Sequence, residues 1–329
     1  MVSAAGNWRA GLGQLVRSPR AVGSLGILLI VVLGCVLAPV YAWFAGNVDP
    51  FAANPVGTVM VHGVSVPLLQ PAAGGLGVVP VGPTGDPAGY LLGADGNGRD
   101  IAVRVLYGGR NTLSIGFAAA VVATIGGLIV GLLAGYLRGV VDVVLSRILD
   151  VVWAFPVLLL AISLSAVSFQ SGLNFGLVKI GSGNLALPIF IIGAVYIPYT
   201  ARVVRGSTLE LTGAPFVEAA VGYGASRARI VGKELLPNVF PRILVLFPVV
   251  VATGIILESG LSFLGVGVRA PDASWGTIVQ DGIGLLRSRP LIAIVPGAFV
   301  AVTVCALNVF GDAVRDAFDP KAAVKVRTP

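Results

Sequence analysis

The sequence has little charge, two cysteines and one histidine in 329 residues. Charged residues make up 11% of the chain, against about 25% in a typical soluble domain, so a soluble globular fold is not expected. Two cysteines do not make a disulfide framework, and a lone histidine, His62, does not make a metal cluster. The sequence also has no GxxxxGK[ST] loop, since Gly232-Lys233 is followed by Glu234. The chain therefore has no phosphate-binding P-loop of its own.

The sequence has long apolar runs and few charges. The chain is 56% hydrophobic, with a mean hydropathy of +0.93, and a helix needs about 20 mostly apolar residues to cross a bilayer core of about 30 Å. The sequence predicts six transmembrane helices, at about 22–44, 112–136, 143–167, 186–205, 242–264 and 290–311. Pro156 is expected to kink the third helix. Gly127, Gly131 and Gly135 have the small-xxx-small spacing that permits close contact between helices.

The basic residues behind the net charge of +7 lie where membrane topology requires them, so nucleic-acid binding is not expected. With the N-terminus inside the cell, most basic residues flank the cytoplasmic ends of the helices, as the positive-inside rule requires. Arg99, Arg104 and Arg110 fall on the predicted outer side and are the exception. The first apolar run is longer than the 7–15 residues of a signal-peptide core, so we expect an uncleaved first helix and two cytoplasmic termini.

Residues 46–98 differ in composition from the rest of the chain. They contain 12 glycines and 7 prolines, a density that is unfavourable to helix. The run 59–66 predicts a short hairpin that turns at His62. We expect a small external insert with a little β structure and no independent core. After it, Asp100 is expected to cap an amphipathic helix over 101–110 that lies at the membrane surface.

A polar loop at about 206–241 separates the fourth and fifth predicted helices. Pro215 suits a first helical turn, and Phe216–Val221 form helix readily. Gly222 and Gly224 then end that helix after about two turns, and a second helix follows. The pattern predicts a helix–turn–helix elbow, which is either a docking surface for a partner or an ordinary connecting loop.

The elbow resembles the EAA signature of permease subunits from binding-protein-dependent ABC importers: Glu218-Ala219-Ala220, then Gly224, then Leu236-Pro237. That family has an aliphatic residue where this chain has Glu234, although peptide-type permeases often have a polar one. The resemblance implies an all-α membrane protein with the type I importer permease fold, and a short coupling helix that docks on a cytoplasmic ATPase. The residues implied in coupling are Phe216, Glu218, Ala219, Ala220, Gly224 and Ala225, with Leu236 and Pro237 at the end of the loop.

Further segments are similar to the dipeptide, oligopeptide and nickel branch of that family. They are Leu92-Gly93-x-Asp95-x-x-Gly98-Arg99-Asp100 followed by Arg104, the run from Glu258 to Gly267 with Ser274-Trp275-Gly276, and the run from Asn308 to Pro320. The long insert before the second helix is typical of the C-type subunit of the permease pair.

The resemblance also implies partners and a location. The partners are a homologous second permease, two cytoplasmic ABC ATPases (or one fused), an extracytoplasmic substrate-binding protein and membrane lipid. ATP and Mg²⁺ would bind the ATPases, and this chain would hold no cofactor or metal. The location is the bacterial cytoplasmic membrane. The expected units are a cytoplasmic tail (1–21), a first helix (22–44), an external insert (45–98), a core (99–312) and a second tail (313–329).

Three questions stay open at this level. Peptides lead as the substrate, with nickel or another small solute second. A passive channel or membrane scaffold would not need the elbow, and a membrane enzyme would need more titratable groups at membrane depth than Glu258. Glu258 itself either lines the translocation path or is a structural carboxylate that caps a backbone break or pairs with Arg269. A charge inside a membrane helix has to face protein or water, and of the two roles we favour the structural one.

Overall fold

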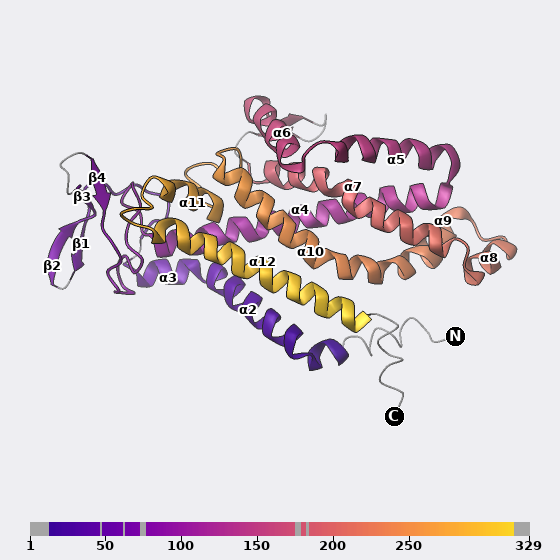
Figure 1. Cartoon of the computed structure of the whole chain (residues 1–329), viewed down its shortest axis with the longest axis horizontal. Coiled ribbons are helices and arrows are strands. Elements are labelled where there is room, and N and C mark those ends of the chain that lie inside the picture. The colour runs from indigo at the N-terminus through magenta and orange to yellow at the C-terminus, as the bar shows by residue number, and fades with distance from the viewer. Residues whose placement is uncertain are drawn as a thin grey trace.

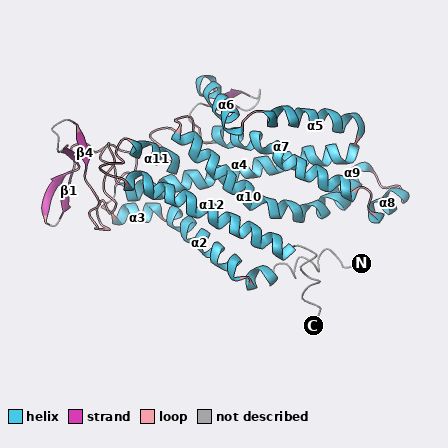
Figure 2. Ribbon diagram, in the orientation of Figure 1, coloured by secondary structure: helices cyan, strands magenta, loops and turns pink. Residues whose placement is uncertain are grey.

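The chain folds into an elongated bundle of helices with strands β1 to β4 at one end (Figures 1 and 2). The structure is a computed structural model and describes residues 13–46, 48–61, 63–72, 77–174, 179–181 and 184–318. The helices are α2 (Pro19–Val36), α3 (Ala38–Phe44), α4 (Ile101–Leu137), α5 (Gly139–Ala154), α6 (Val157–Ser171), α7 (Ala186–Leu211), α8 (Pro215–Gly222), α9 (Arg227–Arg229), the π-helical segment η1 (Ile230–Leu235), α10 (Leu236–Phe263), α11 (Trp275–Ile283) and α12 (Leu291–Phe318).

The described strands pair in antiparallel hairpins. They are β1 (Thr58–Val61) with β2 (Val64–Pro67), β3 (Leu69–Pro71) with β4 (Val78–Pro80), and β5 (Leu173–Asn174) with β6 (Lys179–Ile180). We call the end that carries β1 to β4 the strand end. Helix α8 lies at the opposite end, which we call the elbow end (Figure 1).

Five helical stretches are long and apolar enough to cross a membrane: α2, α4, α7, the run from α9 through α10, and α12. A sixth is reached if α5 and α6 together count as one span. The predicted all-α, multi-pass membrane fold is confirmed, and the helix count stands at five or six.

The prediction of a separate surface helix over 101–110 is wrong. These residues form the first turns of α4, which runs for 37 residues, or about 55 Å at 1.5 Å per residue. Ile101 and Val105 are buried against Trp275 and other apolar residues of α11 and α12. Contacts from distant segments, and not the membrane surface, therefore cover the apolar face of this stretch.

Asp100 caps α4 as predicted. Its carboxylate accepts hydrogen bonds from the backbone N–H groups of Ala102 (2.8 Å) and Val103 (3.2 Å). It also accepts one from the N–H of Tyr90 in the insert (2.9 Å). Burial raises the pKa of the Asp100 carboxyl, and these N–H groups oppose that rise. The cap thus ties the insert to the start of α4.

Pro156 breaks the third predicted helix where the sequence predicted only a kink. Helices α5 and α6 meet at 88°, because proline cannot donate the helical hydrogen bond and disfavours helical geometry at Phe155. Trp153, at the end of α5, stacks on Tyr199 of α7 with ring centroids 6.0 Å apart. Ring contacts therefore help to fix the broken pair against α7.

Helix α4 packs most extensively against α7, along a row of glycines. A Cβ on Gly131 would lie 2.7 Å from the Ala201 carbonyl oxygen and 2.6 Å from the Val204 Cβ. A Cβ on Gly135 would lie 2.6 Å from the Thr208 Cβ. The predicted close contact at the small-xxx-small spacing is confirmed, because a larger side chain would push the two helices apart.

The segment that connects α10 to α12 holds α11. Its first residue, Trp275, is fully buried, and the Trp275 indole N–H donates to the Val105 carbonyl at 2.9 Å. Ser274 caps the helix in a reciprocal pair with Thr277. Helix α11 is thus held among α4, α10 and α12 at the strand end.

The insert forms a small substructure at the strand end (Figure 1). The predicted hairpin is present as β1 and β2, while His62 lies outside the described residues. A minor apolar cluster of Leu68, Val81, Tyr90 and Ala94 supports the second hairpin. The insert is therefore better packed than a loop but has only a small core.

We predict that Gly131→Leu destabilises the protein by about 1–3 kcal/mol, the usual range for overpacking a tight contact. The matched control is Gly206→Leu on α7, where an added Cβ would meet nothing within 4 Å. Thermal unfolding of the detergent-purified protein, followed by size-exclusion chromatography, measures both. Equal unfolding temperatures for the two variants would contradict the packing argument.

Candidate functional site

The elbow, residues 212–237, connects α7 to α10 at the elbow end. Helix α8 begins at Pro215 and turns Val217 inward, where it is buried. Val217 packs with Ile230 and Leu235 of the returning arm in a cluster that continues into α4 and α7. The elbow is therefore built on a shared apolar core, and it is more than a loop that happens to be helical.

The opposite face of α8 points away from the core. Glu218 and Ala219 are exposed on it, and Tyr223, which follows α8, is 92% exposed. Exposed apolar side chains beside a carboxylate are typical of surfaces that a protein partner covers. The remaining residues implied in coupling line the inner side of the elbow, partly buried against its core: Phe216, Ala220 and Ala225.

Gly224 ends α8 through a Schellman motif. The N–H of Ala225 donates to the Ala220 carbonyl (3.0 Å), and the N–H of Gly224 donates to the Val221 carbonyl (2.9 Å). Gly224 has φ +74°, a conformation that glycine adopts without penalty. The predicted two-turn helix that stops at this glycine is present.

The returning arm begins with Ser226, whose hydroxyl caps α9, and continues through η1 into α10. Pro237 lies in the first turn of α10, where a missing N–H is tolerated. The Asn238 side chain donates to the Glu234 carbonyl at 2.6 Å. Glu234, the position that departs from the family pattern, is only partly buried. The adjacent Leu235 supplies the buried apolar contact instead.

Ion pairs brace the base of the elbow. Arg242 of α10 contacts Glu210 of α7 at 2.8 Å. Arg205 of α7 forms a two-pronged pair with Asp142 of α5, at 2.5 and 2.7 Å. The first pair is exposed, so it contributes no more than about 1 kcal/mol, and the second adds the geometric precision of a bidentate contact.

Glu258 is fully buried in α10 near the strand end. Its carboxylate accepts a hydrogen bond from the Ser262 hydroxyl at 2.6 Å. The hydroxyls of Thr112 on α4 and Ser274 at the start of α11 also hydrogen-bond to it. Ser262 in turn accepts from the backbone N–H of Val268 (3.0 Å), beyond the end of α10.

This arrangement bears on the two roles considered for Glu258. The hydrogen-bond donors to its carboxylate are hydroxyl groups from α4, α10 and the start of α11. Through Ser262, the carboxylate supports the backbone where α10 ends. These contacts favour a structural carboxylate that fixes α11 against α4 and α10.

An ion cluster in which all members except Asp281 are buried joins the insert to the bundle, and the sequence did not predict it. Asp95 contacts Arg99 at 2.8 Å and Arg104, and Asp281 of α11 contacts Arg104 at 2.9 Å and Arg99 at 3.2 Å. The charges of the two carboxylates and the two arginines cancel, which lowers the free-energy penalty of burying these groups. The i, i+4 spacing of Asp95 and Arg99 was the one local signal, but Asp281 lies 182 residues from Arg99.

The ion cluster also explains the basic residues that stood out on the predicted outer side. Arg99 and Arg104 belong to this neutral cluster, and Arg110 lies over the Tyr107 ring at 5.6 Å. The charges of Arg99 and Arg104 are therefore held in the folded strand end, and these two residues are poor indicators of topology.

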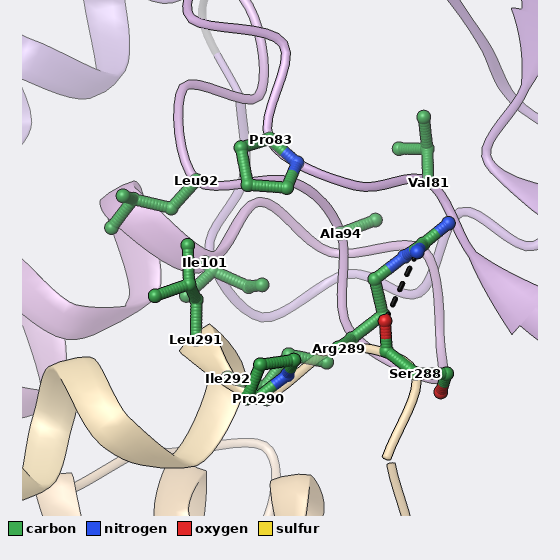
Figure 3. Close-up of a pocket in the computed structure, with 10 residues that line it drawn as sticks. All are labelled: Val81, Pro83, Leu92, Ala94, Ile101, Ser288, Arg289, Pro290, Leu291 and Ile292. Carbon is green, nitrogen blue, oxygen red and sulfur yellow. Dashed lines mark hydrogen bonds between the residues drawn. The ribbon is translucent and has the colours of Figure 1, made fainter. Parts of the chain in front are cut away.

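A cavity of about 230 Å³ lies where the insert meets the start of α12 (Figure 3). Leu92, Ile101 and Ile292 contribute apolar walls. Arg289 borders the cavity and donates from Nε to the Pro80 carbonyl at 2.6 Å. The cavity is thus part of the joint that holds β4 against the bundle.

Comparison with known proteins identifies related chains. The family described as "Binding-protein-dependent transport system inner membrane component" matches residues 127–324. The oligopeptide transport system permease protein OppC of Escherichia coli K12 is 35% identical over 314 residues, covering 95% of this chain and 91% of OppC. OppC of Bacillus subtilis 168 is 40% identical over 232 residues, covering 70% of this chain and 72% of that protein.

A solved structure of the MetNI methionine ABC transporter in inward-facing conformations has the same fold. It superposes with a TM-score of 0.52 at 21% identity, covering 65% of this chain and 95% of that one. The similarity confirms the predicted type I importer permease fold.

We predict that Glu258→Gln destabilises the protein by about 1.5–3 kcal/mol, the range for hydrogen bonds to a charged group. Glu210→Gln, which removes an exposed carboxylate, serves as control and is expected to change stability by less than about 1 kcal/mol. Thermal unfolding in detergent measures both. A Glu258→Gln protein of normal stability but altered substrate choice would place this carboxylate in the translocation path.

Proposed function

The chain belongs to the family of binding-protein-dependent transport system inner membrane components, and we propose that it forms half of the pore of a peptide importer. In this proposal a homologous second permease supplies the other half of the pore. Two cytoplasmic ABC ATPases (or one fused protein) bind ATP and Mg²⁺, and an extracytoplasmic protein delivers the substrate. The observation that carries the proposal is the elbow, which presents Glu218 and Tyr223 at the end of a membrane-spanning bundle.

The elbow is the proposed docking site for the ATPase. Its inner face is anchored to α4 and α7 by the buried cluster around Val217, so a force applied to α8 reaches both helices. Its outer face leaves Glu218 and Ala219 open to a partner. Anchored on one side and open on the other, α8 is suited to transmit a movement of the ATPase to the pore.

The proposed orientation puts the elbow end in the cytoplasm. The start of α2 and the end of α12 point toward that same end of the molecule (Figure 1), which supports cytoplasmic termini and an extracytoplasmic insert. Exposed arginines at the elbow end, among them Arg227 and Arg229, agree with the positive-inside rule. The location in this proposal is the bacterial cytoplasmic membrane.

Alternating access follows from differential binding. Closure of the ATPase dimer on ATP would carry the elbow with it and turn the pore outward, and hydrolysis would reset the pore. A ligand or partner shifts a conformational equilibrium only when it binds the two states with different free energies. The elbow must therefore bind the ATPase more tightly in one pore state than in the other.

Peptides are the proposed substrate. The support is that relatives which cover most of this chain are named as oligopeptide permeases, including the E. coli protein that matches 95% of it. The resemblance of the segment from Leu92 to Arg104 and of the C-terminal motifs to the peptide and nickel branch agrees. Uptake assays with labelled dipeptides, longer peptides and nickel in a deletion strain would separate these substrates.

The first test is affinity purification of the tagged chain from native membranes in mild detergent, followed by mass spectrometry. We expect recovery of a second permease and P-loop ATPases. A chain that is purified alone, under conditions where a known transporter stays intact, would contradict the importer proposal.

We predict that Glu218→Lys lowers retention of the ATPase by about tenfold or more, because a charge reversal in a docking surface costs on the order of 1.4 kcal/mol or more. The matched control is Asp316→Lys, an exposed reversal on α12 away from the elbow. Copurified ATPase and transport-coupled ATP hydrolysis are the two readouts. Normal coupling in Glu218→Lys would refute the docking role.

Gly224→Val is predicted to leave the protein folded but to weaken coupling. An added Cβ would meet nothing within 4 Å, while φ +74° is unfavourable for valine by about 1–2 kcal/mol. The end of α8 should therefore shift without disturbing the bundle. An unfolding temperature close to that of the wild type, with uncoupled ATP hydrolysis, is the expected pair of results. Normal transport would count against the proposal.

A further inference from the structure

A polar hollow of about 340 Å³ opens beside the elbow, where α4 ends. Its walls come from the end of α4 and the turn after it, from the end of α7, from α8 and from α9. The residues that line it are Tyr136, Leu137, Arg138, Thr212, Val217, Val221 and Arg227. Two guanidinium groups thus border one hollow, and none of the described lining residues carries a carboxylate.

Arg138 occupies an unusual position in this wall. It has φ 51° and ψ −168°, a backbone conformation that favours glycine and is unfavourable for a side chain. Its guanidinium donates to the Thr212 hydroxyl at 2.6 Å, which directs the charge toward the end of α7. An arginine held in a glycine-like conformation points to a role for its side chain.

Carboxylates on the neighbouring helices α5, α7 and α8 are already paired or lie outside the hollow. Asp142 is bound by Arg205 at 2.7 Å, and Glu210 by Arg242 at 2.8 Å. Glu218 lies on the exposed face of α8 and does not line the hollow. The charges of Arg138 and Arg227 are therefore available to an anion.

The surroundings indicate what kind of anion. Arg138 follows the last residue of α4, a helix that contains a candidate membrane span, so the hollow lies on the polar side of that span. Leu133, Leu137 and Val140 are exposed on the adjoining surface, the last of them at 79%. Tyr136 is a residue type that is enriched at membrane interfaces. A charged hollow next to an apolar, lipid-exposed surface fits a headgroup with its acyl chains.

We propose that this hollow binds the phosphate-bearing headgroup of an anionic phospholipid, with Arg138 and Arg227 contacting the phosphate. Basic pockets between helices on the cytoplasmic side bind lipid headgroups in other membrane proteins. Because one arginine comes from the end of α4 and the other from α9, the bound headgroup bridges the bundle and the moving arm of the elbow. Anionic lipid would then hold the elbow in its packed position.

The test uses the full chain in mild detergent with phosphatidylglycerol or phosphatidylcholine, and native mass spectrometry counts the bound lipids. The double variant Arg138→Gln, Arg227→Gln should lose about 30-fold in phosphatidylglycerol binding, since each basic residue near a headgroup contributes about fivefold. The double variant Arg147→Gln, Arg229→Gln removes two exposed arginines that do not line the hollow. This control should bind phosphatidylglycerol as the wild type does.

Two further arms keep the proposal falsifiable. Arg227→Gln alone should lose about fivefold, and it leaves the strained turn at Arg138 untouched if the double variant fails to fold. Inorganic phosphate at equal concentration should displace little phosphatidylglycerol, because it lacks the acyl chains.

Three results would overturn the proposal. Equal losses in both double variants would mean a diffuse basic surface. Full displacement by inorganic phosphate would mean a site for free phosphate. Unchanged lipid binding together with lost ATPase retention would mean that these arginines recognise a protein. Lipid counting does not depend on transport, so its outcome is separate from that of the importer proposal.

Discussion

Close contact between backbones along α4 is the interaction on which the rest of the structure depends. A Cβ on Gly254 of α10 would lie 2.8 Å from the Gly116 carbonyl oxygen, and Gly131 allows the same approach to α7. Helices surrounded by lipid gain little from the hydrophobic effect, so dispersion and hydrogen bonds must hold them together. The Thr200 hydroxyl supplies one such bond, to the Ala123 carbonyl at 2.6 Å. The insert, α11 and the elbow are all placed by this one helix.

The polar groups at the two ends of α4 have different roles. At the strand end they contact one another: hydroxyl groups surround the buried carboxylate of Glu258, and Asp95 and the more exposed Asp281 pair with two buried arginines. Such networks specify a single arrangement of α11, since removing one member leaves the others unpaired. At the elbow end the polar groups face outward, where Glu218 remains free to meet a partner. The strand end is thus organised for rigidity and the elbow end for recognition.

Features that depend on neighbouring residues could be predicted from the sequence, and contacts between distant segments could not. The apolar character of the membrane helices, the cap at Asp100 and the end of α8 at Gly224 depend on neighbours within a few residues, and these features are present in the structure. Continuity of α4 depends on Trp275, a residue far along the chain, so periodicity alone placed 101–110 at the membrane surface. A proline in an apolar run is compatible with a kink or a break, and contacts with α7 decide in favour of the break at Pro156. The ion cluster needed Asp281, which no local pattern identifies.

Gly224 is required for its left-handed backbone conformation and not for its small size. Space around it is open, so the restriction at this position comes from the mirror-image region of backbone space that its φ of +74° occupies. An L-residue has a strained backbone there whatever its volume, whereas a D-residue of the same volume would be unstrained. Asparagine, the L-residue that tolerates this region best, is therefore the substitution with which the elbow should retain its shape.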